Sequence, residues 1–341
     1  MLMRILVTGA TGFLGGALAR RLQDMGHEVT GLGRNAVVGA QLEEDGITFV
    51  QADLADAHAM MRACQGQDVV FHSGAKSELW GTMREFYTAN VVGTENIVAG
   101  CLRHHVERLI HVSTPGIYFT GEDRLDIREW EPLPKKQANA YTQTKLWAEG
   151  VVDRAVREGL PAIILRPRGI VGAGDTSILP RVLKAADSGR LRKIGKGRNI
   201  ADFTHVENVV DALLLCLEAP KETFGQKYNI TNGEPVVLWD ILSTFCGWMG
   251  YTLPPGRVPF SIAWNIAYAM EWKSKLVQAK EEPFLTRYGV GLLAKSMTLN
   301  IQAAREELGY TPRYDSWDAA RDFVDWWRAQ HTIATTEKAA A

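Results

Sequence analysis

A glycine-rich loop directly follows the first apolar run of the chain, and it strongly limits the folds that the chain can adopt. The run Arg4–Thr8 leads into TGATGFLG, which places Gly9, Gly12 and Gly15 ahead of an amphipathic stretch. Glycine permits positive φ and a close approach of the backbone to a ligand, and the N-terminus of the following helix attracts anions. The GxxGxxG spacing at a strand–turn–helix junction therefore predicts a loop that holds the diphosphate of a dinucleotide. The alternative is a tight turn that binds no ligand.

Short apolar runs alternate with amphipathic helical stretches over the first two-thirds of the chain. We expect strands at Arg4–Thr8, Glu28–Leu32, Thr48–Gln51, Val69–Ser73, Arg108–Ser113 and Ala162–Pro167. We expect helices at Leu14–Met25, Ala57–Cys64, Glu85–His105 and Tyr141–Glu158. The alternation predicts βαβ units, and hence an α/β fold with a Rossmann-type doubly wound parallel sheet.

The pattern changes after about Gly172, where glycine, proline and tryptophan become frequent. This change predicts a smaller, mixed C-terminal lobe that binds the substrate. We expect residues 1–175 and 203–231 to form the nucleotide-binding domain, and residues 176–202 and 232–331 to form the lobe. Residues 332–341 are expected to be a disordered tail.

Composition argues against several classes of protein. The 341 residues carry a formal net charge of −1, which gives no indication of a nucleic acid or an anionic membrane as partner. The four cysteines lie far apart without a CxxC pair, and no histidine lies at metal-ligand spacing, so we expect reduced cysteines and no metal. No run reaches the ~20 apolar residues of a membrane span. No signal peptide is apparent, and the expected location is the cytoplasm.

The most apolar segment, Val258 to Trp272, places Trp264, Tyr268 and Trp272 at helical spacing. No transmembrane helix is predicted here, because the segment is short and polar residues interrupt it. Three interpretations of the aromatic side chains stay open: the core of the lobe, the wall of an apolar substrate pocket, or a peripheral contact with a membrane.

The end of the second predicted strand reads GLGRN and carries no acidic residue. NAD-specific sites place Asp or Glu there to bind the ribose 2′-hydroxyl, whereas an arginine accommodates a 2′-phosphate. Gly33 leaves room and Arg34 follows it, so the sequence favours NADP(H), with NAD(H) as the alternative. Asp53 and Leu54, in QADLAD after the third strand, are expected at the adenine edge.

A tyrosine and a lysine stand four residues apart in the helical stretch AYTQTKLWAE. This spacing places Tyr141 and Lys145 on one helix face. A free tyrosine titrates near ~10, and a nearby lysine cation favours the phenolate, which suits general acid–base work. Ser113 and Thr114 end the fifth strand at its carboxyl edge, where either hydroxyl could bind a substrate oxygen.

Eight motifs occur in a characteristic order: TGATGFLG, QADLAD, FHSGAKS, ANVVGTEN, HVSTPGIY, YTQTK, LRPRGIVG and ADFTHVENVVDA. Over roughly residues 3–330 they resemble the extended short-chain dehydrogenase/reductase superfamily, of NAD-dependent epimerase/dehydratase type. The resemblance implies that Thr114 is the catalytic hydroxyl and that Tyr141 donates or accepts the proton. It also implies that Lys145 lowers the pKa of the tyrosine and binds the nicotinamide ribose, and that Asn90 supports the lysine.

The same resemblance implies a cofactor site and a homodimer. The dimer would form through the helices around Glu85–His105 and Tyr141–Glu158. The expected cofactor residues are Gly9, Thr11, Gly12, Phe13, Leu14, Gly15, Arg34, Asn35, Asp53, Leu54, Ser73, Gly74, Ala75, Lys76, Ser113, Tyr141, Lys145, Pro167, Arg168 and Ile170.

Two departures separate the chain from sugar-nucleotide branches of this superfamily. Pro115 and Gly116 follow the threonine where dehydratases resembling this chain carry an Asp-Glu pair. Ala201 in ADFTHV stands where sugar-nucleotide enzymes carry a diphosphate-binding arginine, although Arg181 or Arg198 could replace it.

The SELWG segment, the STP motif, the apolar segment and REELGYTP resemble the 3-beta-hydroxysteroid dehydrogenase and 2-alkyl-3-oxoalkanoate reductase branch. This branch interconverts a secondary alcohol and a ketone on a lipophilic substrate, either a 3-beta-hydroxysteroid or a 3-hydroxy/3-oxoacyl compound. The alternatives are a nucleotide-sugar epimerase of the same superfamily and a non-catalytic NADP-sensing binding protein.

Overall fold

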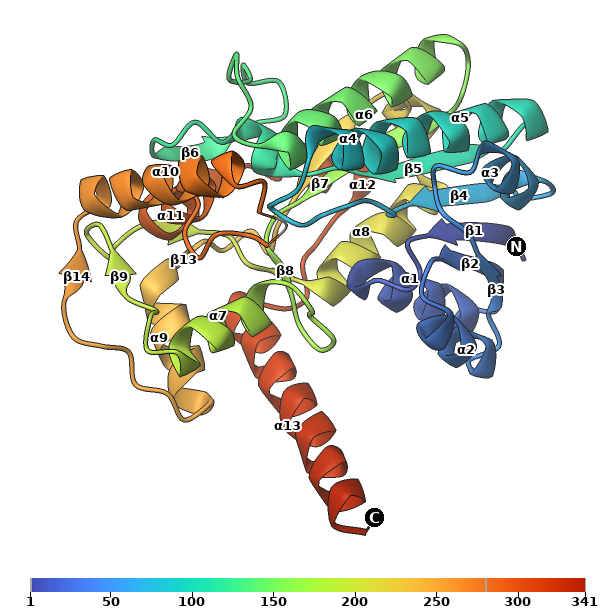
Figure 1. The fold of residues 1–341 in the computed structure, drawn as a ribbon. Coiled ribbons are helices and arrows are strands. Elements are labelled where there is room, and N and C mark those ends of the chain that lie inside the picture. Colours follow the sequence, from blue (N-terminus) through green and yellow to red (C-terminus); the bar gives the residue numbers. More distant parts are fainter. Residues whose placement is uncertain (1, 280, 341) are drawn as a thin grey trace.

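A seven-stranded parallel sheet forms the centre of the large domain (Figure 1). The computed structural model describes the backbone of residues 2–279 and 281–340, and side chains as far as His331. The strand order is β12 (Lys227–Ile230), β7 (Ala162–Pro167), β5 (Arg108–Val112), β4 (Val69–His72), β1 (Arg4–Thr8), β2 (Glu28–Gly33) and β3 (Thr48–Gln51). All six strand pairings are parallel, which confirms the predicted doubly wound α/β fold.

Helices cover both faces of this sheet (Figure 1). One face packs against α3 (Ala57–Cys64), α5 (Gly93–His104) and α6 (Ala140–Arg157). The other face packs against α1 (Phe13–Asp24), α8 (Val206–Glu218) and α12 (Gln302–Leu308). The central strands are covered on both sides, as their continuous apolar runs indicated. Helix α2 (Ala36–Glu44), which Asn35 caps, is not among the predicted helices.

The predicted single helix Glu85–His105 is wrong in one respect. It consists of α4 (Met83–Phe86), a π-helical turn η1 (Tyr87–Val92) and α5. A π turn inserts one residue into the helical repeat and reorients the side chains within it, often at a functional site. Asn90 lies in this turn, and the apolar periodicity of the segment does not reveal the insertion.

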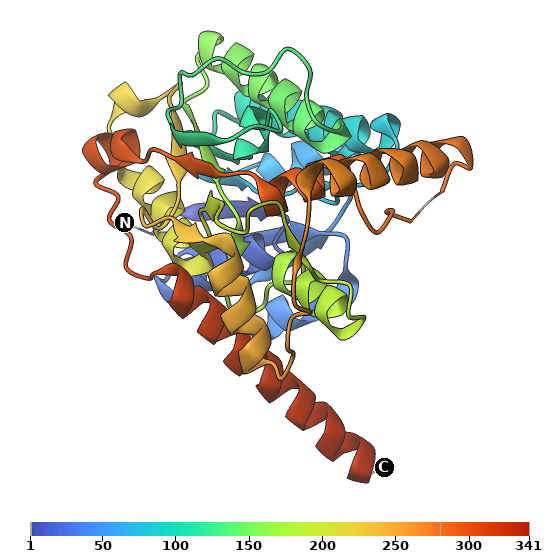
Figure 2. The same ribbon diagram turned by 90° about the vertical axis from the view of Figure 1, so that its left-hand side faces the viewer.

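A smaller lobe lies beside the carboxyl edge of the large sheet (Figures 1 and 2). Its mixed sheet has the order β13 (Val236–Val237), β10 (Ile200–Ala201), β15 (Met297–Leu299) and β6 (Arg124–Ile127). Two further pairs are β11 (Thr204–His205) with β8 (Ile170–Val171) and β14 (Arg257–Val258) with β9 (Lys193–Ile194). The remaining helices are α7 (Ile178–Asp187), α9 (Leu238–Trp248), α10 (Phe260–Leu276), α11 (Arg287–Ala294) and α13 (Ser316–Ala340). Phe245 of α9 packs against Phe323 of α13.

Two segments depart from the predicted division of the chain, which otherwise stays a prediction. Strand β6 comes from the first 175 residues but joins the sheet of the lobe. Ala304, Leu308 and Tyr310 come from the predicted lobe but pack into the core of the large sheet. The backbone of α13 continues to Ala340, and the side chains of the predicted tail, residues 332–341, lie outside the described residues.

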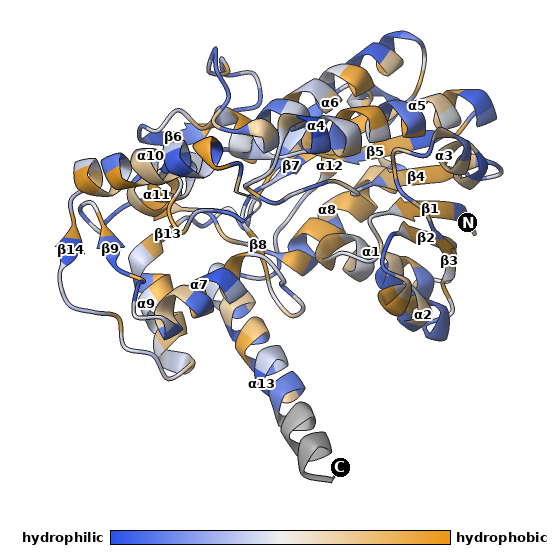
Figure 3. Ribbon diagram, viewed as in Figure 1, coloured by the Kyte–Doolittle hydropathy of each residue, from blue (hydrophilic) through white to orange (hydrophobic). Residues whose placement is uncertain are grey.

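The three aromatic residues of the apolar segment do not share one environment. Trp264 packs on the lobe core beside Phe260, whereas Tyr268 and Trp272 are 54% and 60% exposed. Neither a common core face nor a common pocket wall therefore describes all three. Figure 3 shows that α10 mixes hydrophobic and hydrophilic turns. Within the described residues, no helix is long and apolar enough to cross a bilayer.

Candidate active site

The glycine loop lies between β1 and β4, where the order of the sheet reverses direction and α/β folds bind ligands. Gly9 has φ +73°, and a Cβ at this position would stand 2.7 Å from the Cα of Gly74. A Cβ on Gly15 would run into the carbonyl oxygen of Gly9. Gly12 begins α1 without a side-chain cap, and the first turn holds no acidic residue, so its N–H groups suit an anion. These features fit the diphosphate of a dinucleotide.

Other predicted loop residues contribute in different ways. Leu14 is buried in the core, so only its backbone can face a ligand. Phe13 opens α1 and is half-buried. The Ser73 hydroxyl donates to the Thr8 carbonyl at 2.6 Å and is used within the protein. The Gly74 N–H donates to the Thr8 hydroxyl at 3.1 Å, which fixes the loop after β4.

The end of β2 differs from the prediction in one detail. The space left by Gly33 is filled by the Thr11 side chain, which a Cβ at position 33 would strike. The missing side chain therefore accommodates the glycine loop and leaves no free room for a phosphate. Arg34 is 72% exposed by side chain and forms a 3.6 Å ion pair with Asp53. Asn35 accepts hydrogen bonds from the first N–H groups of α2.

Asn90 fixes the backbone of the loop that follows β4. Its side chain accepts a hydrogen bond from the Lys76 N–H at 2.7 Å and donates to the Lys76 carbonyl at 3.1 Å. It also donates to the Thr144 hydroxyl at 3.1 Å. None of the described hydrogen bonds joins Asn90 to Lys145. Asn90 therefore reaches the lysine only through its neighbour in α6 and orders residues 75–76 directly.

Thr114 and Tyr141, two of the predicted catalytic residues, interact through a side-chain hydrogen bond. Asn139 and Thr142 cap the start of α6 reciprocally and hold Tyr141 in its first turn. Thr114 follows β5 and caps the 3₁₀ turn that begins at Pro115. Burial raises the pKa of Tyr141, and the hydrogen bond with the Thr114 side chain opposes that rise. The tyrosine is thus held protonated, ready to donate to a substrate oxygen.

Lys145 is buried, and its ammonium group is directed at β5. Its ammonium donates to the Val112 carbonyl at 2.6 Å and lies 3.3 Å from His111 Nε2. Burial lowers the pKa of Lys145 to about 8, and nearby Glu149 opposes that shift. The expected lowering of the Tyr141 pKa by this lysine is absent, because the ammonium is directed at β5 and burial dominates the pKa of the tyrosine.

Two buried histidines behind the lysine are absent from the sequence prediction. The rings of His72 and His111 lie 5.2 Å apart. His111 Nε2 accepts from Lys145, so its proton is assigned to Nδ1, which has no partner among the described residues. Burial lowers the pKa of His72 to about 3, so this imidazole is neutral. Histidines on neighbouring parallel strands would have been the only indication in the sequence.

Of the two hydroxyl candidates, the structure leaves only Thr114 for the substrate. The Ser113 hydroxyl donates to Glu149 at 2.6 Å. Glu149 also accepts two hydrogen bonds from Arg166, at 2.6 and 2.8 Å, and both side chains are nearly fully buried. A buried carboxylate needs such donors, so the Ser113 side chain is a structural group.

The lobe brings further polar groups to the site. Tyr288 of α11 places its hydroxyl 2.8 Å from the point where a Cβ on Gly116 would lie, and Thr114 Oγ1 lies 3.3 Å from the same point. Pro167 ends β7 and Ile170 begins β8, and their predicted contact with the cofactor stays a prediction. The Arg168 side chain instead enters the lobe, where it lies 3.4 Å from the Met297 sulfur.

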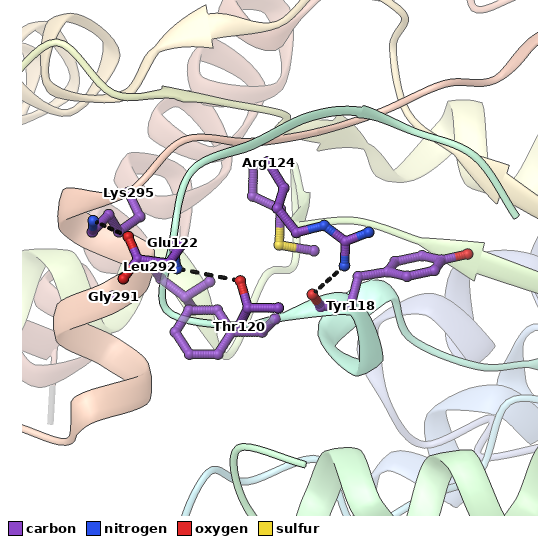
Figure 4. A pocket seen from close by; sticks show the side chains of 9 residues that line it. Tyr118, Thr120, Glu122, Arg124, Gly291, Leu292 and Lys295 are labelled. Atoms are coloured by element: carbon purple, nitrogen blue, oxygen red, sulfur yellow. Dashed lines mark hydrogen bonds and ion pairs between the residues drawn. The ribbon is translucent and has the colours of Figure 1, made fainter. Parts of the chain in front are cut away.

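A small hollow lies between residues 118–124 and residues 291–297 of the lobe (Figure 4). Phe119 lines it and also packs edge-on against Tyr288 at 4.8 Å. Thr114, Tyr141 and Lys145 do not line this hollow, so it lies apart from the reacting groups. The other lining residues are Tyr118, Thr120, Glu122, Arg124, Gly291, Leu292, Lys295 and Met297.

Known proteins resemble this arrangement in sequence. Residues 5–231 match the NAD dependent epimerase/dehydratase family. The chain is 34% identical over 316 residues to the 2-alkyl-3-oxoalkanoate reductase of Stenotrophomonas maltophilia, covering 91% of this chain and 95% of that protein. It is also 34% identical over 299 residues to 3beta-hydroxysteroid-dehydrogenase/decarboxylase isoform 1 of Arabidopsis thaliana, covering 84% of this chain and 67% of that protein.

Solved structures share the fold. A UDP-glucuronic acid 4-epimerase from Bacillus cereus, solved in complex with NAD, superposes with a TM-score of 0.75 and 22% identity. The superposition covers 96% of this chain and 99% of the epimerase. At this identity the likeness extends to the architecture alone.

Proposed function

Because this chain belongs to the NAD-dependent epimerase/dehydratase family, we propose that it interconverts a secondary alcohol and a ketone on a lipophilic substrate with NADP(H). The observation that carries the proposal is the convergence of Thr114 and Tyr141 beside a buried Lys145, at the sheet edge that also carries the glycine loop. Relatives named as ketoreductases and hydroxysteroid dehydrogenases support this class of reaction.

In the proposed reaction, Thr114, Tyr141 and Lys145 have different roles. When bound, the nicotinamide supplies or accepts the hydride. Thr114 orients the substrate oxygen, and Tyr141 exchanges a proton with it. Lys145 binds the ribose next to the tyrosine and brings a positive charge to the site. The glycine loop after β1, Arg34 after β2 and residues 74–76 after β4 would hold the dinucleotide.

NADP(H) is the proposed form of the cofactor, with NAD(H) as the alternative. Arg34 is the cation at the end of β2, and its exposed 3.6 Å pair with Asp53 is weak enough to exchange for a phosphate. The filled space at Gly33 does not contribute to this preference.

Two observations favour this reaction over sugar-nucleotide chemistry. An acidic side chain at position 116 would meet the Tyr288 hydroxyl, which would have to move away, and no acidic residue is present at this position. Ala201 is buried in β10, and Arg181, one candidate to replace the missing diphosphate arginine, forms an ion pair with Glu282 at 3.1 Å.

Two surfaces suggest further partners. Tyr87 and Trp147 pack edge-on at 5.9 Å and are 41% and 42% exposed beside α5 and α6, so we propose that a second copy of the chain covers them. We further propose that α10 makes a peripheral membrane contact through Trp272, beside the exposed Lys273. A monomeric mass by light scattering would reject the first proposal, and failure to sediment with anionic lipid vesicles would reject the second.

Consumption of NADPH with 3-oxosteroids and 3-oxoacyl compounds tests the proposed reaction. Tyr141→Phe removes the proton donor and is expected to abolish turnover while NADPH binding is retained. Unchanged turnover in this variant would refute the role of the tyrosine. Saturable binding and epimerisation of UDP-sugars, without turnover of either ketone class, would replace the proposal by the epimerase. Cofactor binding with no turnover of any of these compounds would indicate a binding protein.

A further inference from the structure

The Tyr288 hydroxyl occupies the place from which dehydratases of this type would present an acid. A Cβ on Gly116 would stand 2.8 Å from Tyr288 Oη, 3.0 Å from Thr142 and 3.3 Å from Thr114 Oγ1. A phenol from the lobe and the catalytic threonine from β5 therefore surround one point. The glycine is required here because its missing side chain admits the phenol.

Local structure fixes the direction of this phenol. Thr286 caps the start of α11 by accepting a hydrogen bond from the Gly289 N–H at 3.1 Å, and Phe119 packs edge-on against the tyrosine ring. Burial raises the pKa of Tyr288 to about 12, while Arg168 lowers it and Tyr141 raises it. The phenol thus stays protonated at neutral pH and acts as a hydrogen-bond donor.

A buried cation lies within electrostatic reach of this phenol. Arg168 is 8% exposed, its Nε has no hydrogen-bond partner among the described residues, and its one described side-chain contact is the Met297 sulfur. Asp202 is also buried, and one of its oxygens has no partner. Asp202 attracts the Arg168 guanidinium electrostatically, but among the described residues the two form no hydrogen bond or close ion pair, so the guanidinium keeps donors for another group. Unmet donors in a buried site are costly unless a ligand satisfies them.

We propose that the Tyr288 hydroxyl, with the Arg168 guanidinium behind it, binds a second oxygen of the substrate. That oxygen is the C1 oxygen of a 3-hydroxy- or 3-oxoacyl group whose C3 oxygen lies on Thr114 and Tyr141. The inference rests on the proposed function and narrows it, because a sterol with an isolated 3-hydroxyl has no acceptor at this position. A substrate carboxylate should bind Arg168 more strongly than an ester carbonyl does, because its hydrogen bond joins two charged groups.

Three alcohols and NADP⁺ test the assignment: 3-hydroxydecanoate, its methyl ester and 2-decanol. Tyr288→Phe is expected to lower kcat/KM for both 3-hydroxyacyl compounds by about 10- to 100-fold, the equivalent of one lost hydrogen bond, and to leave 2-decanol unchanged. Arg168→Met should lower kcat/KM for the acid more than for the ester. Tyr268→Phe, an exposed tyrosine of the same lobe, serves as the matched control.

Calorimetric titration of 3-hydroxydecanoate into the NADP⁺-loaded protein gives a second readout. Its dissociation constant should rise in Tyr288→Phe by about the factor lost in kcat/KM. Equal losses on all three alcohols, or no loss on any, would overturn the inference and leave the proposed reaction standing. Wild-type protein that binds 3-hydroxydecanoate through Tyr288 but oxidises none of the alcohols would instead overturn the proposed reaction.

Discussion

The ammonium group of Lys145 donates a hydrogen bond to the carbonyl oxygen of Val112 at 2.6 Å, one residue after the imidazole of His111 in β5. Lys145 therefore extends from α6, and its ammonium group is fixed by a hydrogen bond to β5. The desolvation of the ammonium outweighs its attraction to Glu149, and the pKa of Lys145 falls to about 8.

This pKa predicts that cofactor affinity depends on pH. Lys145 is charged below about pH 8 and neutral above it, so its attraction for the cofactor is present at neutral pH and lost in alkali. The dissociation constant of NADP⁺, measured by fluorescence titration between pH 6 and pH 10, should rise through that window. Lys145→Arg keeps the charge and should give a flat profile. An equally steep rise in the arginine variant would contradict this assignment.

Removal of the Ser113 hydroxyl should lower stability, whereas removal of the neighbouring Thr114 hydroxyl should lower activity. Ser113→Ala deprives buried Glu149 of one donor, and the free energy of unfolding should fall by about 1–3 kcal/mol, with kcat nearly unchanged. Thr114→Ala should lower kcat by about 100-fold or more, because it removes a group that contacts the reacting oxygen. Thr114→Ser retains the hydroxyl and should recover most of the activity. Urea unfolding and steady-state kinetics on the three variants distinguish the two roles, and a reversed pattern would show that Ser113 faces the substrate.

Local pattern was sufficient to predict most of the large sheet. Apolar runs bounded by glycine or polar residues placed β1, β3 and β7 at their observed bounds. Tyr141 and Lys145 were also predictable, because their spacing on one helix is a property of the local chain. The π turn around Asn90 was not, since an inserted residue leaves the apolar periodicity nearly intact.

Long-range pairing accounts for what the sequence could not predict at the site. Ser113 and Thr114 are adjacent and chemically alike, and only the position of Glu149, brought beside them by folding, separates their roles. Tyr288 reaches Gly116 from 172 positions along the chain, within a lobe whose sequence carries no motif that indicates a ligand. Burial, set by the whole fold, raises the pKa of both Tyr141 and Tyr288.

Arg34 should determine the choice between the two nicotinamide cofactors. Arg34→Ala is expected to raise the dissociation constant of NADPH by about 10- to 100-fold, because a charge-assisted contact with the 2′-phosphate is lost. NADH lacks that phosphate and should bind as before. Arg20→Ala removes another exposed arginine that is paired with an aspartate, Asp45, and is the matched control. Equal affinities for the two cofactors, unaltered in Arg34→Ala, would overturn the preference for NADP(H).

His72 should make the fold sensitive to mild acid. Its Nδ1 lies 2.8 Å from the Thr8 hydroxyl and its Nε2 lies 3.0 Å from the Thr94 hydroxyl. The Thr94 hydroxyl donates to the Asn90 carbonyl, so Nε2 is assigned as the donor and Nδ1 as the acceptor. Burial lowers the pKa of this histidine from 6.5 to about 3. In the unfolded chain it binds a proton near its ordinary pKa, so the stability that it contributes is present above pH 6.5 and is lost as the pH falls toward 3.

His72→Asn removes this titration and leaves an amide oxygen that can accept from Thr8. The loss in free energy of unfolding between pH 7 and pH 4.5, measured by urea denaturation, should be smaller in the variant than in the wild type by about 2 kcal/mol. His58→Asn changes an exposed histidine and should leave the loss as it is in the wild type. If His72→Asn lost as much stability in acid as the wild type does, a proton would already be bound at His72 in the folded protein. Nδ1 would then donate to the Thr8 hydroxyl, so the direction assigned to that hydrogen bond would have to be reversed, while Nε2 would still donate to Thr94.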